Sequence, residues 1–167
     1  GGFLGLGDLL HDVEDALQRF LLDCPKHKDC TLPKDPKAAT RQILAMLSAL
    51  DTSPGLLSDG RQFTQSMGIT GIVGGLYDKV YGWTELRTAL ATALDGDYTA
   101  LAQSVDFYTS RQENGSFSDN SNEAIVAVNC LDHPTRYSTK SVAADAVKWS
   151  KEAPVFGAYL AWGDITC

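Results

Sequence analysis

Residues 8–24 read DLLHDVEDALQRFLLDC, and apolar side chains recur through this stretch at the spacing of one helix face. The apolar set comprises Leu9, Leu10, Val13, Leu17, Phe20 and Leu21. Asp12, Glu14, Asp15 and Arg19 are assigned to the opposite, solvated side. Apolar residues three and four positions apart predict an amphipathic α-helix that buries one face against a core.

The same periodicity continues along the chain and predicts further helices over about 36–50, 84–95, 98–111, 123–132 and 138–149, with a last apolar segment at 154–162. Asp35 followed by Pro36 marks a helix start, because aspartate caps helix N-termini and proline fits the first helical position. Residues 113–122 form the clearest predicted loop. Ile-Val-Ala-Val at 125–128 could also be a strand, but its wider context favours a helix. The predicted fold class is all-α.

Composition narrows the classes of partner. The chain has 167 residues, 44 % of them hydrophobic, and a formal net charge of −7. This length favours a single domain. An acidic chain is repelled by nucleic-acid phosphates and by anionic lipid, so neither partner is expected. No window approaches the ~20 apolar residues of a membrane span, so no transmembrane segment is predicted.

Glycines crowd residues 68–75, which read GITGIVGG. Glycine-rich loops can bind phosphate, but this stretch lacks the Gly-Lys-Ser/Thr ending of a P-loop and follows no clear strand. We therefore interpret these glycines as positions of close helix packing or of a kink.

Four cysteines, Cys24, Cys30, Cys130 and Cys167, allow three pairings. A local Cys24–Cys30 disulfide is favoured, which leaves Cys130 with Cys167. Two disulfides indicate an oxidising compartment. Four free thiols in the cytosol are the alternative. A zinc site using Cys24, His27 and Cys30 is disfavoured because the spacing matches no strong zinc pattern.

The stretch EAIVAVNCLDHP, residues 123–134, collects an acid, a cysteine, an aspartate and a histidine, but it forms no recognisable catalytic motif. Gly-x-Ser-x-Gly is absent from the chain, and His11, His27 and His133 stand in no context typical of a catalytic base. Glu123 and Asp132 lie nine residues apart, about 13 Å along a helix, which is too far for a glycosidase pair. No catalytic residue, metal or cofactor is assigned.

An ordered series of short motifs covers nearly the whole chain, from about Val13 to Cys167. It includes Leu-Leu-Asp-Cys24, Asp-Cys30, Asp-Pro-Lys-Ala, Ser-Asp-Gly-Arg61, Leu-Tyr77, Trp-Thr-Glu-Leu, Asn-Cys130-Leu-Asp132 and Ala-Trp-Gly-Asp-Ile-Thr-Cys167. The series resembles the lid of the tripeptidyl-aminopeptidase-like α/β-hydrolases, serine exopeptidases secreted by actinomycetes that include mycobacterial cell-envelope proteases. In that family the nucleophilic serine precedes the lid, and the catalytic acid and histidine follow it.

The resemblance implies a compact helical lid over residues 13–167 that is inactive alone and covers its own α/β-hydrolase catalytic core. Residues 1–12 match poorly and are expected to be an engineered or divergent lead-in segment. Location outside the cell or in the cell envelope follows from the same resemblance.

A lid of this kind shapes the groove that admits a peptide N-terminus, and an ammonium group calls for a carboxylate partner. Glu123 is the first candidate and Asp132 the second, each with a capping or solvated role as the alternative. Aromatic residues that could line an apolar subsite, unless they belong to the core, are Tyr77, Trp83, Phe107 and Tyr108.

Two other hypotheses remain open. One is a free-standing secreted helical module that binds a protein or an apolar ligand. The other is a cytosolic helical protein without disulfides.

Overall fold

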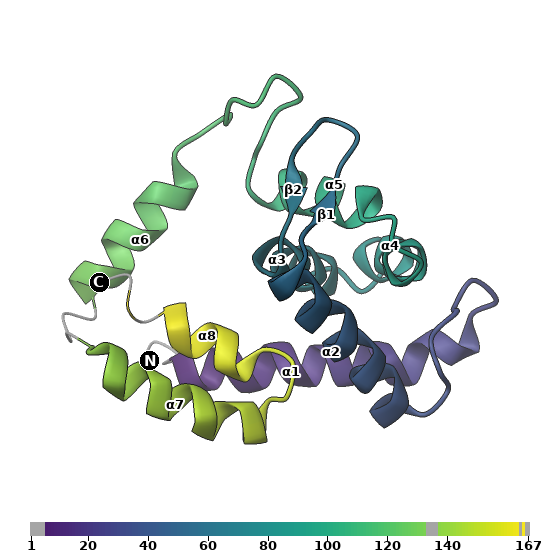
Figure 1. Cartoon of the computed structure of the whole chain (residues 1–167), viewed down its shortest axis with the longest axis horizontal. Helices are drawn as coiled ribbons and strands as arrows, with labels where there is room; N and C mark the ends of the chain where they lie inside the picture. The colour runs from purple at the N-terminus through teal and green to yellow at the C-terminus, as the bar shows by residue number, and fades with distance from the viewer. Residues whose placement is uncertain (1–5, 133–136, 164, 166–167) are drawn as a thin grey trace.

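The computed structural model of the chain describes residues 6–132, 137–163 and 165 (Figure 1). The described residues form eight α-helices and one short hairpin. The helices are α1 (Leu6–Asp23), α2 (Pro36–Thr52), α3 (Gln65–Leu76), α4 (Gly82–Leu94), α5 (Thr99–Tyr108), α6 (Ser121–Asp132), α7 (Thr139–Glu152) and α8 (Gly157–Gly163). The predicted all-α class is confirmed, and α1 runs through the boundary expected after residue 12.

The hairpin was not predicted. Its strands β1 (Gly55–Leu56) and β2 (Gln62–Phe63) pair antiparallel, with Gly55 opposite Phe63. Two residues per strand are too few to show an alternating pattern, so periodicity cannot detect such strands. The aromatic ring of Phe63 is fully buried and stacks on Tyr98 at 5.0 Å between ring centroids.

Helix α3 lies at the centre of the core and carries the glycine-rich stretch. Its neighbours include α1, α2, α4 and α5. A Cβ atom at Gly71 would lie 2.9 Å from the backbone oxygen of Leu101 on α5. The glycines therefore permit close helix packing, as predicted, and the stretch is helix rather than a phosphate loop.

Helix α1 packs its predicted apolar face against this core. Leu17, Phe20 and Leu21 are buried there, and Phe20 meets the indole ring of Trp83 edge-on at 5.8 Å between centroids.

The assignment of Glu14 to the solvated side of α1 is wrong. Its residue surface is only 5 % exposed. The side-chain Oε2 accepts the backbone N–H of Val155 at 3.1 Å and that of Phe156 at 3.3 Å. Burial raises the pKa of Glu14, although the hydrogen bonds from these two amides oppose the shift. Glu14 precedes Leu17 by three positions, and this spacing places both on one side of the helix.

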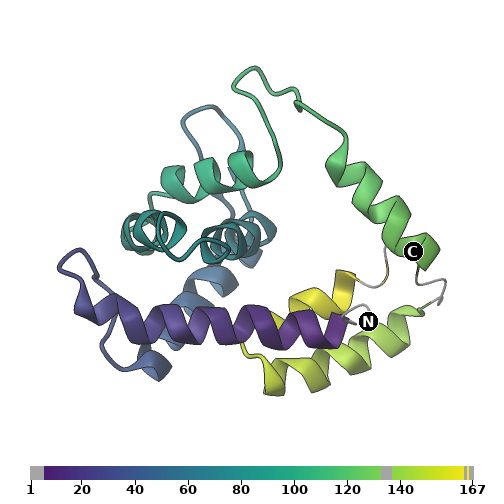
Figure 2. The ribbon, with the colours of Figure 1, turned by 180° about the vertical axis from the view of Figure 1, so that it is seen from behind.

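Helices α7 and α8 form a helical pair at the end of the chain, and α8 also lies beside α1 (Figure 2). The hydroxyl of Ser138 accepts the N–H of Ser141 at 3.1 Å and so caps α7. Val142, Ala146 and Phe156 are buried in this region. The first and last described helices are therefore packed together.

The predicted Cys24–Cys30 disulfide is present, so the free-thiol and zinc hypotheses are wrong for these two residues. It closes the loop after η1 (Cys24–Lys26), from which Asp29 accepts the Nε–H of Arg87 at 2.8 Å. This hydrogen bond lowers the pKa of Asp29. The predicted Cys130–Cys167 bridge ends on a residue outside the described ones and stays a prediction.

Candidate functional site

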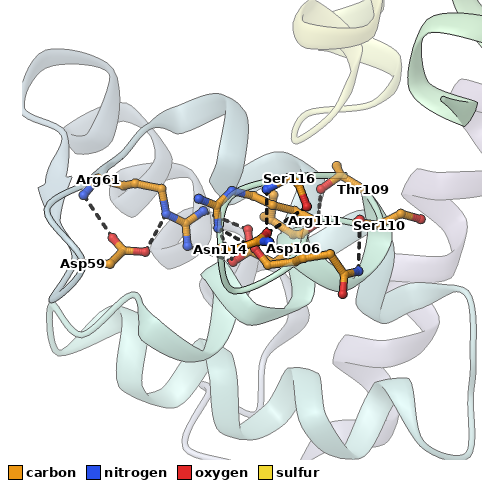
Figure 3. Close-up of polar contacts among 10 residues, drawn as sticks. Asp59, Arg61, Asp106, Thr109, Ser110, Arg111, Asn114 and Ser116 are labelled. Carbon is orange, nitrogen blue, oxygen red and sulfur yellow. Dashed lines mark hydrogen bonds and ion pairs between the residues drawn. The ribbon is translucent and has the colours of Figure 1, made fainter. Parts of the chain in front are cut away.

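A cluster of two aspartates and two arginines joins the hairpin turn to the end of α5 (Figure 3). The guanidinium of Arg61 donates from Nη1 and Nη2 to the two oxygens of Asp106, each at 2.8 Å. Its Nε–H donates to Asp59 at 2.6 Å, and Arg111 approaches Asp106 at 3.6 Å. This bidentate geometry is the most directional form of ion pair in proteins.

Ionisation of the cluster is reinforced by its own hydrogen bonds. The backbone N–H and side chain of Arg61 hold the pKa of Asp59 below its usual value. The hydrogen bonds with Asp106 and Asp59 raise the pKa of Arg61. Asp59 and Arg61 therefore stay charged at neutral pH. The two hydrogen bonds from Arg61 to Asp106 fix the hairpin turn to α5.

The loop that leaves α5 is ordered by local polar contacts (Figure 3). Ser110 adopts the left-handed backbone region with φ of 59°. Asn114 Oδ1 accepts the backbone N–H of Ser116 at 3.0 Å. Further along, the amide of Asn122 donates to the carbonyl of Thr109 at 2.8 Å. The predicted loop is thus confirmed over 113–120, whereas residues 121 and 122 already belong to α6.

Helix α6 extends from this loop and lies apart from α2–α5 (Figure 1). None of its residues is buried. Ile125, Val128 and Leu131, spaced three residues apart, are 59 %, 53 % and 80 % exposed. A twelve-residue helix is marginal in water without packing, and an exposed apolar stripe of this kind marks an interaction surface.

The two carboxylates proposed to bind an ammonium group are both on α6. Glu123 lies in its first turn and Asp132 is its last residue. Both residues are exposed. Among the described residues, the carboxylate that is buried and accepts hydrogen bonds from backbone amides is that of Glu14.

The four aromatic candidates do not gather at one point. Tyr77 and Tyr108 come together with ring centroids 5.7 Å apart, and partial burial and the contact with Tyr77 raise the pKa of Tyr108 to about 12. Phe107 is 90 % exposed. Trp83 is largely buried against α1, on the edge of a surface pocket that Tyr77 also lines.

The described histidines pair with carboxylates. His27 Nε2 lies 2.9 Å from Asp23, and His11 Nε2 lies 3.7 Å from Glu152. His133 lies outside the described residues. Within the part of the chain that the structure describes, no three His, Cys, Asp or Glu side chains are arranged to hold a metal. Helices of that same part are too short or too polar to cross a bilayer.

Two polar groups that organise the structure were not predicted: the Arg61–Asp106 pair and the buried Glu14. The Arg61–Asp106 pair joins residues 45 positions apart, and no local pattern could connect them. Glu14 had a usable signal, because it lies at helical spacing from Leu10 and Leu17 within the apolar face.

Comparison with curated proteins relates the chain to hydrolases of mycobacteria. It is 29 % identical over 128 residues to serine protease Hip1 of Mycobacterium tuberculosis, an alignment that covers 72 % of this chain and 24 % of that protein. It is 27 % identical over 154 residues to carboxylesterase B of the same organism, covering 92 % of this chain and 28 % of that protein. A protein of Mycobacterium bovis, matched with the same identity and coverage, is named a putative hydrolase.

These matches identify distant relatives and support a relationship to serine hydrolases. The chain spans about a quarter of the length of the curated relatives that it matches. No family model matches the chain.

Proposed function

We propose that this chain is the lid of a larger serine hydrolase of the tripeptidyl-aminopeptidase-like type, and that α6 packs against the catalytic core. The observation that carries the proposal is the exposed apolar stripe of α6. A helix with this stripe needs a partner surface in water. The relatives are about four times as long as the aligned segment, and one of them is named a serine protease. A hydrolase domain is therefore the partner that we propose for the apolar stripe of α6.

Three further features support a lid. The absence of Gly-x-Ser-x-Gly agrees with a nucleophile supplied by the core. Contact between α1 and α8 brings the first and last described helices together, as an insertion into another domain requires. The Cys24–Cys30 disulfide agrees with work outside the cell or in its envelope.

In this role the chain would close over the reaction centre, exclude water and shape the path of a peptide substrate. Glu123 and Asp132 lie on the same helix as the docking stripe, so α6 would carry a carboxylate to the mouth of the active site. Tyr77 and Tyr108 would offer an apolar contact to the peptide.

The test measures association of this chain with the serine-bearing portion of its parent hydrolase by calorimetric titration. Ile125→Ser and Leu131→Ser should each weaken binding about ten-fold, because each removes apolar area from the contact. Both variants should keep the melting temperature of the isolated chain, since neither side chain is buried in it. Val147→Ser on α7 is the matched control, because Val147 is 62 % exposed and lies on another helix.

Two results would count against the proposal. One is the absence of any association between the two portions. The other is hydrolysis of a tripeptide anilide by the isolated chain that a serine-directed inhibitor abolishes. The role of Glu123 has a separate test: Glu123→Gln in the complete enzyme should reduce the preference for substrates with a free N-terminus.

A further inference from the structure

A surface pocket of about 450 Å³ opens between the second half of α1 and the turn that joins α3 to α4. Its apolar lining includes Leu22, Leu76, Tyr77 and the indole of Trp83. This volume lies in the range of small-molecule sites. The pocket is distinct from α6 and from the Arg61–Asp106 cluster, because it shares no lining residue with either.

Three cations and one carboxylate also line the pocket: Arg19, Lys26, Lys79 and Asp23. The charge of the lining is therefore positive, although the chain as a whole is acidic. Lys26 is paired with Asp23 at 3.3 Å. Arg19 forms an exposed ion pair with Asp15 at 4.0 Å.

Lys79 is held differently, because its Nζ lies 5.4 Å from the centre of the Trp83 ring. The carboxylate beside it in sequence, Asp78, accepts the backbone N–H groups of Val80 at 2.7 Å and Tyr81 at 3.0 Å. Lys79 therefore has no carboxylate partner among the described contacts, and Arg19 has only the long, exposed contact with Asp15, so both cations can receive an anion at the pocket.

Trp83 gives the pocket a spectroscopic reporter. Its residue surface is 7 % exposed, and its Nε1–H is buried without an acceptor among the described residues. A buried donor without an acceptor is unfavourable, and such groups are rare in folded proteins. The ring that carries this donor forms part of the pocket lining.

We propose that this pocket binds a carboxylate carried by an apolar group. Arg19 and Lys79 would bind the carboxylate, and Leu22, Leu76 and the Trp83 ring would cover the apolar group. Two sources have this chemistry: the C-terminal residue of a peptide and a short free carboxylic acid. The pocket shares Tyr77 with the proposed peptide contact, but its test needs only the isolated chain and does not depend on the lid function.

The test follows the three indole N–H signals of the ¹⁵N-labelled chain by NMR during titration with N-acetyl-L-leucine. Trp149→Phe and Trp162→Phe assign the remaining signal to Trp83 without altering the pocket. The Trp83 signal should shift in a saturable manner while the other two stay in place. The matched control ligand is N-acetyl-L-leucinamide, which has the same side chain without the charge and should bind at least ten-fold more weakly.

Variants then locate the charge. Arg19→Gln and Lys79→Gln should each weaken N-acetyl-L-leucine about five-fold, the effect of losing one exposed ion pair. Lys148→Gln on α7 should have no effect, because Lys148 is an exposed lysine remote in sequence from the pocket lining.

A parallel titration with 4-methylpentanoate separates the two sources. Tighter binding of N-acetyl-L-leucine assigns the site to peptide C-termini, and tighter binding of 4-methylpentanoate assigns it to free acids. The proposal is overturned if neither acid shifts the Trp83 signal. Equal affinity of acid and amide, or equal effects of Lys79→Gln and Lys148→Gln, would overturn it as well.

Discussion

Glu14 Oε2 accepts the backbone N–H of Val155 at 3.1 Å, although 141 residues separate the two in sequence. The same oxygen accepts the N–H of Phe156 at 3.3 Å. A single carboxylate on α1 thus satisfies two backbone donors at the turn between α7 and α8. This turn is buried, so water is a poor substitute for the carboxylate.

Replacing Glu14 by alanine should lower the free energy of unfolding by about 2–4 kcal/mol, because two buried N–H groups lose their acceptor. Glu14→Gln keeps an amide oxygen at this position and should be much less harmful. Urea unfolding followed by circular dichroism measures both. Equal losses for the two variants would show that shape, rather than hydrogen bonding, matters at this site.

The stability of Glu14→Gln and that of the parent chain should also depend differently on pH. Burial raises the pKa of Glu14 above its ordinary value of 4.5, so the folded state holds this proton more tightly than the unfolded state. The resulting stabilisation is present below about pH 4.5 and is lost as the pH rises through the folded-state pKa. The stability of Glu14→Gln relative to the parent should therefore increase from pH 4 to pH 7. Taking the difference cancels the opposite contributions of Asp23, Asp29, Asp59, Asp97 and Asp119, whose pKa values are lowered.

Gly71→Ala should destabilise the chain by about 1–3 kcal/mol, because the new methyl group would meet the Leu101 carbonyl at 2.9 Å. Gly74→Ala on the same helix is the matched control. Its Cβ would find its nearest neighbour at 3.4 Å, and alanine favours helices over glycine by up to ~1 kcal/mol. Thermal unfolding should give a lower midpoint for the first variant only; a parallel change in both would contradict the close-packing explanation.

Removing the Cys24–Cys30 disulfide as the double alanine variant should lower stability by about 2 kcal/mol in the loop-entropy model. Denaturant unfolding without reductant measures the loss. Asp29 should also become more mobile, so the Arg87 ion pair should weaken in the variant. Unchanged stability would show that the η1 loop is fixed by that ion pair alone.

Arg61→Gln should loosen the loop from which α6 extends, because Asp106 would lose its bidentate partner. Hydrogen exchange of the amides over 109–120 should accelerate, while amides of α3 keep their protection. Arg41→Gln serves as the control, since Arg41 is exposed on α2. Equal exchange in the two variants would assign the order of this loop to its own local hydrogen bonds.

The sequence predicted the helices well because their signals are local. Asp35 accepts the N–H groups of Lys37 and Ala38, with Pro36 at the first helical position, as a capping rule anticipates. The α6 helix was predicted from the same periodicity. The surface that covers the apolar side chains of α6 could not be predicted, because periodicity reveals that a face is apolar and says nothing about its partner.

The surroundings of the candidate site residues depend on contacts between distant parts of the chain, which local sequence patterns do not reveal. Tyr77 and Tyr108 were both named and do meet, whereas Trp83 turned out to be packed on α1. Glu14 was misassigned because the neighbouring acids Asp12 and Asp15 suggested a uniformly solvated side. Its burial is decided by amides that come more than a hundred residues later.

The bond between Glu14 and Val155 also has a consequence during synthesis. A chain is synthesised from its N-terminus, so α1 emerges long before the segment that completes its packing. Leu17 and Phe20 can pack against α3 and α4 early. The part of α1 around Glu14 can complete its contacts only after residue 156 has emerged. Folding of the emerging chain should therefore proceed in two stages, with the α7–α8 pair closing the structure last.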